Sequence, residues 1–194
     1  KWVDQVVKDF PQNADVWGIQ MKIHLMMEDK EPKKFLEKAI RAVSRQIELA
    51  PGNVGPRLER FKLFVRKTDL ARAMQELNDI YAMYKKYPNL HFQRGNLFSL
   101  MGNAKSAMDE YREELKSHPD NVNAVLALGN ENLKAKNLDE ALRLFSDAMR
   151  LAPKSGEPRQ LAGYVQFLKK DYDAAVALLL SAVELDPGNP TGYK

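Results

Sequence analysis

The sequence predicts an all-α protein built from a repeated pair of antiparallel helices, and three observations lead to this prediction. Apolar residues between 122 and 153 recur with helical spacing in two segments, which a short turn at 136–137 separates. The same pattern returns after 34 residues, so that Gly129 corresponds to Gly163 and Pro153 to Pro187. No segment reads as a β-strand. Two amphipathic helices cannot bury their apolar faces alone, and we therefore expect the repeats to stack on one another.

The repeat over 120–153 shows the pattern best. We expect its two helices at about 122–134 and 138–151, followed by Pro153, which cannot continue a helix. Small residues on both helices allow a close approach, and one aromatic side chain fills the space between them. These residues are Gly129, Ala141 and Ala148, with Phe145 as the aromatic.

This unit resembles a tetratricopeptide repeat (TPR), whose usual period is 34 residues. The preceding repeat carries the same kind of set, namely Gly95, Phe98, Ala107 and Tyr111. The last one ends in the family-like LDPGNP at 185–190. The resemblance implies a right-handed superhelical solenoid. We expect one array over 1–194, with partial repeats at 1–11 and 188–194 and full repeats at about 12–51, 52–87, 88–119, 120–153 and 154–187. Because both ends fall inside repeats, we expect the sequence to be a piece of a longer array.

Taken in order, the helix pairs are expected at 14–29 and 33–49, 54–66 and 69–86, 89–101 and 104–117, 122–134 and 138–151, and 156–169 and 172–185. A charged break at 28–34, which contains Pro32, explains the long first repeat. The second pair includes Tyr81, Tyr84 and Tyr87, whose spacing of three predicts one helical stripe packed against the next repeat, or alternatively an exposed contact patch.

The final helix differs from the others because it is apolar nearly all round, with seven apolar residues in succession at 174–180. Such a helix is expected to be buried on both sides. This pattern indicates a further repeat, a capping helix or a partner that covers it.

Composition excludes several kinds of chemistry. The chain has 194 residues and no cysteine, which rules out disulfides, thiolate catalysis and cysteine-ligated zinc or iron–sulfur sites. No apolar run is long enough to span a membrane. The net charge of +4 is uneven: residues 1–97 hold 18 Lys and Arg against 12 Asp and Glu, whereas residues 98–194 hold 12 against 14. This is either ordinary surface scatter or a docking surface for an acidic partner.

No catalytic constellation is visible. The three histidines have no second ligand at metal spacing, and His91 and His118 stand beside turn prolines, where we expect polar loop residues. The carboxylate pairs Glu113–Glu114 and Asp139–Glu140 are expected on solvated helix faces. We therefore expect neither an enzyme nor a metal or cofactor site, which agrees with the family, whose arrays are mostly binding scaffolds.

In that family the first helix of each repeat lines a concave groove for an extended peptide or a helix. Carried over by register, the groove-lining residues are Lys22, Lys62, Arg66, Phe92, Asn96, Asn130, Lys134, Tyr164 and Phe167. An asparagine amide there can hold a partner's backbone. One subfamily clamps the terminal carboxylate of chaperone tails with lysines, but the corresponding positions here are Gly18, Leu58, Phe92, Leu126 and Gln160, which argues against that ligand.

The leading hypothesis is a non-catalytic scaffold that binds a peptide or helix of a partner protein, acidic or amphipathic, within a bacterial assembly or regulatory complex. An alternative is an RNA-binding helical repeat, because basic and aromatic residues alternate at 57–67. Against it, the charge balance is mild and the aromatic residues keep core spacing. A third alternative is self-association through the uncapped ends.

Overall fold

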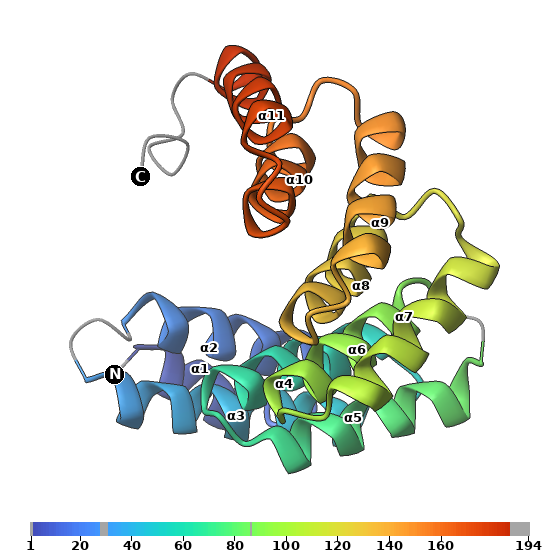
Figure 1. The fold of residues 1–194 in the computed structure, drawn as a ribbon. Coiled ribbons are helices and arrows are strands. Elements are labelled where there is room, and N and C mark those ends of the chain that lie inside the picture. The colour runs from blue at the N-terminus through green and yellow to red at the C-terminus, as the bar shows by residue number, and fades with distance from the viewer. Residues whose placement is uncertain (1, 28–30, 86, 187–194) are drawn as a thin grey trace. The chain divides into compact units, whose positions relative to one another are not determined.

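The computed structural model describes residues 2–27, 31–85 and 87–186, and every regular element in these ranges is an α-helix (Figure 1). The helices are α1 (Trp2–Asp9), α2 (Ala14–Met26), α3 (Pro32–Leu49), α4 (Val54–Arg66), α5 (Leu70–Met83), α6 (Leu90–Leu100), α7 (Ala104–Ser117), α8 (Val122–Lys134), α9 (Leu138–Leu151), α10 (Glu157–Leu168) and α11 (Tyr172–Leu185). The chain forms two compact units, Lys1–Leu90 (unit 1) and His91–Lys194 (unit 2). The prediction of an all-α solenoid of helix pairs is confirmed, and its right-handed path stays a prediction.

Unit 1 contains α1 to α5, and each helix packs against the next along the chain. The second helices of the two pairs bury one apolar face almost completely, with Ala39 and Val43 on α3 and Ala73, Leu77 and Ile80 on α5. Helical spacing of apolar residues therefore predicted this core correctly.

One polar side chain is enclosed in the first helix pair. His24 of α2 is buried, its ring centroid lies 6.0 Å from that of Phe35, and its Nδ1 has no hydrogen-bond partner among the described residues. Burial lowers the pKa of His24, and the positive charges of Lys38 and Arg41 lower it further, whereas Asp4 acts in the opposite direction. The neutral imidazole is therefore the form that the fold favours.

Unit 2 contains α7 to α11, together with α6, which begins at the boundary. Its core includes the small and aromatic residues that the repeat pattern predicted, namely Ala107, Tyr111, Ala141, Phe145, Ala148, Ala162 and Val165. Gly129 is required at the closest crossing, because a Cβ built there would lie 2.5 Å from Cε1 of Phe145. The close approach predicted between the helices of this repeat is confirmed.

The turn inside each repeat is also periodic. One residue has a positive φ in each of four successive turns, 34 positions apart: Thr68 (61°), Gly102 (75°), Lys136 (62°) and Lys170 (65°). The next residue is Asp or Asn in each case, and at Asp69, Asn103 and Asp171 its side chain accepts a hydrogen bond from a backbone N–H of the following helix. This cap satisfies a donor that the helix start leaves free.

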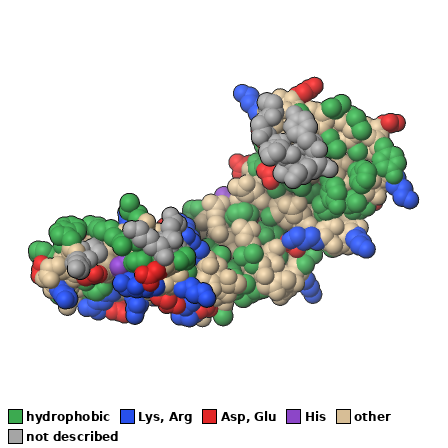
Figure 2. Space-filling view, turned by 90° about the vertical axis from the view of Figure 1, so that its left-hand side faces the viewer, with side chains coloured by type: hydrophobic (Ala, Val, Ile, Leu, Met, Phe, Trp, Pro, Cys, Tyr) green, Lys and Arg blue, Asp and Glu red, His purple; other side chains and the backbone are tan. Residues whose placement is uncertain are grey.

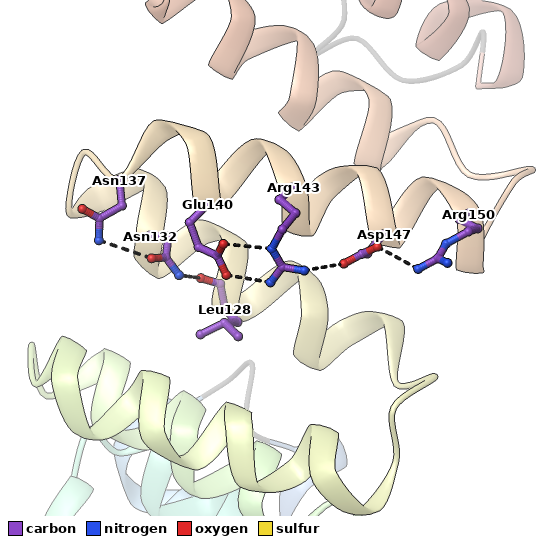
Figure 3. A network of polar contacts seen from close by, with 7 residues as sticks. All are labelled: Leu128, Asn132, Asn137, Glu140, Arg143, Asp147 and Arg150. Atoms are coloured by element: carbon purple, nitrogen blue, oxygen red, sulfur yellow. Dashed lines mark hydrogen bonds and ion pairs between the residues drawn. The ribbon is translucent and has the colours of Figure 1, made fainter.

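The turn between α8 and α9 uses its asparagine differently (Figure 3). Asn137 donates from Nδ2 to Oδ1 of Asn132 at 3.3 Å, and Nδ2 of the buried Asn132 donates to the Leu128 carbonyl at 2.9 Å. The side chain therefore ties the turn to the preceding helix instead of capping the next one.

Two predicted details are wrong. Helix α5 ends at Met83 and not at 86, and Tyr84 leaves the helical conformation so that its hydroxyl can donate to the Gly52 carbonyl at 3.3 Å. Tyr84 and Tyr87 therefore lie beyond the helix, and the tyrosines form no single helical stripe. The predicted end of the first helix at 29 falls outside the described residues, and α2 ends at Met26.

The expectation for α11 is also wrong for the described residues. Among the described helices, α10 is the one that packs closely against it, and Tyr172, Val176 and Leu180 are each more than half exposed. The corresponding residues of α9, Leu138 and Leu142, are partly buried in the core that α10 helps to form. Figure 2 shows hydrophobic side chains gathered on the surface of the C-terminal helices. No helix in the described part of the chain is long and apolar enough to cross a membrane.

Candidate functional site

In unit 1, the predicted groove contains an open hollow of about 530 Å³ between α2 and α4. Lys22 and the half-exposed Ile19 line it on α2, Glu59 lines it on α4, and Gln46 of α3 also contributes to the lining. Gly18 leaves room for that amide, since a Cβ there would lie 2.8 Å from Nε2 of Gln46. The hollow thus combines an apolar wall, an amide and charges of both signs.

The other two predicted cations of unit 1 do not line this hollow. Lys62 is exposed and pairs with Glu59 at 2.8 Å. Arg66 lines a second hollow, of about 420 Å³, together with Lys67, which pairs with Glu37. A hydrogen bond from Lys67 holds the pKa of the Glu37 carboxyl below its usual value. The structure therefore separates Lys22 from Arg66.

The basic segment at 57–67 is largely neutralised within unit 1. Arg60 contacts the buried Glu76 at 2.5 Å, and Arg57 lies 3.8 Å from the other oxygen of the same carboxylate. Burial raises the pKa of Glu76, although both arginines act to lower it. The guanidinium groups of Arg57 and Arg60 are mostly covered, which weakens the RNA-binding alternative because phosphates need accessible cations. Sequence reasoning missed Glu76, whose signal was an acid on the apolar face of α5.

In unit 2, Asn96 of α6 is held by Tyr111 of α7. The Tyr111 hydroxyl donates to Oδ1 of Asn96 at 2.9 Å, and the ring centroid of Phe92 lies 6.0 Å from that of Tyr111. Burial raises the pKa of Tyr111 to about 12, and the negative charge of Glu131 contributes. Tyr111 was predicted as a core aromatic residue, and its hydroxyl contact was missed.

Lys134 also lies in a polar cluster that the sequence did not reveal. Its Nζ is 2.7 Å from Oε1 of Glu131, a buried carboxylate that also accepts a hydrogen bond from Oγ of Ser99 at 2.6 Å. The positive charge of Lys134 is thus balanced locally, while most of its side chain stays exposed.

The remaining predicted groove residues are accessible. Asn130 of α8 is half-buried, and no hydrogen bond to its side chain is present in the described ranges. Tyr164 and Phe167 of α10 are 50% and 52% exposed, and the ring of Phe167 packs edge-on against Tyr172 at 5.8 Å. These three residues can therefore meet a ligand without rearranging the core.

The histidines and acid pairs partly depart from expectation. His91 lies inside α6 rather than in a loop and contacts Glu110 at 2.8 Å. Glu114 is buried rather than solvated and accepts from the Phe92 N–H at 3.3 Å and from the Asn121 amide at 3.1 Å. Sequence periodicity could not show that other helices cover these positions.

On α9, by contrast, the predicted solvated face is present (Figure 3). Arg143 makes two contacts with Glu140, at 2.7 and 2.9 Å, and one with Asp147 at 2.9 Å. The hydrogen bonds from Arg143 lower the pKa of Glu140, which keeps the carboxylate ionised. In the residues that the structure describes, no group of three or more His, Cys, Asp or Glu side chains could hold a metal ion.

Comparison with known proteins agrees with this architecture. Two family models described as tetratricopeptide repeat match residues 92–156 and 132–194. No curated protein sequence matches the chain.

Several solved structures share the fold. A MamA structure (residues 41 to the end) from Desulfovibrio magneticus RS-1 superposes with a TM-score of 0.70 and 15% identity, covering 88% of this chain and 97% of that one. PilW, a type IV pilus biogenesis factor, gives 0.74 and 16%, covering 97% and 84%. YrrB, described as a TPR protein with an unusual peptide-binding site, gives 0.65 and 15%, covering 99% and 96%.

Proposed function

We propose, from the premise that this chain is a tetratricopeptide repeat protein, that it is a scaffold which binds an elongated segment of a partner protein along the first helices of its repeats. The proposal treats residues 12–187 as one array of five repeats. The coarser conclusion, a protein-interaction scaffold, follows from the repeats themselves.

One observation carries the finer proposal. Asn96, Asn130 and Tyr164 occupy equivalent positions on α6, α8 and α10, and each is accessible or half-buried rather than enclosed in the core. Hydrogen-bonding groups spaced by whole repeats suit an extended peptide or a helix better than a compact metabolite. Amide groups can hold the partner's backbone, which presents a donor and an acceptor at each residue.

The chemistry of the predicted groove residues limits the partner further. Tyr164 and Phe167 offer apolar surface with one hydroxyl, and the hollow beside Lys22 offers an apolar wall with a cation at its edge. Lys62 and Lys134 already pair with acids, so a preference for acidic segments depends mainly on Lys22. We therefore favour an amphipathic segment with few acidic residues over a strongly acidic one.

Two proteins of similar fold support this class of function. YrrB is described as having a peptide-binding site, and PilW as a pilus biogenesis factor. A role within a bacterial assembly or regulatory complex is accordingly part of the proposal.

The test uses a peptide selected against the intact protein from a displayed random library. Replacing Asn96 and Asn130 together by alanine should weaken its binding at least tenfold, as expected for two lost hydrogen bonds of about 0.5–1.5 kcal/mol each. The helical circular dichroism and the melting temperature should stay nearly unchanged. Asn123→Ala is the matched control, because this asparagine is exposed on α8 but outside the row.

The contrary result is also defined. If the peptide survives the double change but is lost when Tyr81 and Tyr84 become alanine, binding lies elsewhere and the groove residues are ordinary repeat decoration. Two further measurements address the alternatives. Steep loss of RNA binding between about 50 and 200 mM salt would favour the nucleic-acid hypothesis, and a concentration-dependent mass in sedimentation would favour self-association.

A further inference from the structure

We infer that Tyr111 is a positioning residue, which fixes the Asn96 amide so that its NH₂ group faces the groove and receives a hydrogen-bond acceptor from the partner. This inference rests on the proposed function and assigns the chemistry of one of its contacts. It predicts a carbonyl or carboxylate oxygen of the bound segment opposite Asn96.

The position of the hydroxyl is determined by packing. Tyr111 is 2% exposed, and its ring lies over Gly95, where an added Cβ would be 2.5 Å from Cε1 and 3.1 Å from Cζ. The ring of Phe92 packs beside it. A side chain held on these sides cannot rotate away, and the hydroxyl therefore stays 2.9 Å from Oδ1 of Asn96.

The direction of the hydrogen bond follows from the chemistry of both groups. Tyr111 keeps its proton at any physiological pH, since burial and the charge of Glu131 raise its pKa to about 12. An asparagine side chain has one carbonyl oxygen, which accepts, and one NH₂, which only donates. Once Oδ1 accepts from Tyr111, the NH₂ is the group that remains for a ligand.

The next repeat provides an internal comparison. Phe145 stands 34 residues after Tyr111 and lies over Gly129 in nearly the same way, with distances of 2.5 Å to Cε1 and 3.1 Å to Cζ from an added Cβ. Phe145 has no hydroxyl, and the side chain of Asn130 makes no hydrogen bond within the described ranges. Asn130 can therefore turn either its oxygen or its NH₂ toward a ligand, whereas Asn96 can offer only the NH₂.

The first experiment needs no ligand. Nuclear magnetic resonance relaxation and residual dipolar couplings of the ¹⁵N-labelled asparagine side chains report their order in the full chain. We expect an ordered Asn96 NH₂ and a mobile Asn130 NH₂ in the wild type. Tyr111→Phe should release Asn96, and Phe145→Tyr should order Asn130. Equal mobility of Asn96 with and without the Tyr111 hydroxyl would overturn the inference.

The second experiment measures affinity for the library-selected peptide. Tyr111→Phe should weaken binding about two- to tenfold, in line with the loss of one hydrogen bond. The same change should have no further effect once Asn96 is alanine, because it acts through that amide. Asn96→Asp, which keeps an acceptor for Tyr111 but removes the NH₂, should weaken binding at least as much as Asn96→Ala.

Failure of the inference can be distinguished from failure of the proposed function. Additive effects of Tyr111→Phe and Asn96→Ala would show that Tyr111 acts on stability alone, and would refute the positioning role. If the peptide ignores Asn96 altogether, the proposed groove is wrong, while the relaxation data still decide whether Tyr111 orients the amide.

Discussion

The turn inside each repeat offers the sharpest test of how local conformation contributes to stability. Gly102 and Lys136 occupy equivalent positions with φ of 75° and 62°, but only Gly102 lacks a Cβ. A left-handed conformation costs a residue with a Cβ about 1–2 kcal/mol, whereas glycine loses roughly 0.5–1 kcal/mol more conformational entropy than alanine on folding. The backbone strain therefore outweighs the entropy difference. We expect Gly102→Ala to destabilise the protein by about 1 kcal/mol and Lys136→Gly to stabilise it by roughly 0.5–1 kcal/mol.

The structure supports assigning these effects to the backbone alone. A Cβ built on Gly102 meets no atom within 4 Å, so that Gly102→Ala introduces no collision. Lys136 is exposed. Lys136→Ala is the matched control, since it removes the charge but keeps the strain, and it should leave stability within about 0.5 kcal/mol of the wild type.

Urea unfolding followed by circular dichroism measures these changes. With a slope of about 1–3 kcal/mol per molar urea, a change of 1 kcal/mol moves the midpoint by roughly 0.3–1 M. An unchanged midpoint for Gly102→Ala, or a lower one for Lys136→Gly, would refute the assignment of these effects to left-handed strain.

Three further predictions concern buried positions. Ala141→Leu should destabilise the protein by roughly 1–3 kcal/mol through overpacking, because Ala141 is fully buried, and an unchanged melting temperature would contradict this packing. Glu76→Ala should cost about 3 kcal/mol in urea unfolding because it leaves arginines unpaired, whereas Glu59→Ala, at an exposed ion pair, should cost less than about 1 kcal/mol; similar losses would refute the difference. The lowered pKa of His24 means that the unfolded chain binds the proton more tightly, so stability should fall as the pH drops through about 6.5 toward the folded value, and less so in His24→Leu. Equal losses between about pH 7.5 and pH 5.5 in both proteins would contradict that reasoning.

Much of the fold could be predicted because its determinants are local and periodic. Apolar spacing and small residues specify which face of each helix is buried, as Ala141 and Phe145 show. Prolines and asparagines near the helix starts set most boundaries to within one residue. Because every repeat must present the same surface to its neighbours, one clearly patterned repeat was enough to locate the others.

The polar contacts could not be predicted, since they depend on which neighbour covers a given side chain. Glu76 and Glu114 look like ordinary surface acids in the sequence, yet both are buried by adjacent helices. Tyr84 leaves its helix to reach the Gly52 carbonyl, 32 residues earlier in the chain. Each of these arrangements depends on residues brought together by packing rather than by sequence spacing.

The candidate groove shows the same division. The sequence by itself determined the row of Asn96, Asn130 and Tyr164, because register in a 34-residue repeat places them on equivalent helix positions. Only the tertiary structure decided that Tyr111 reaches Asn96 while Phe145, its counterpart, has no hydroxyl to offer Asn130. The repeat fixes where a side chain stands, but hydrogen bonding needs two atoms about 3 Å apart, and that distance is set only when the helices pack.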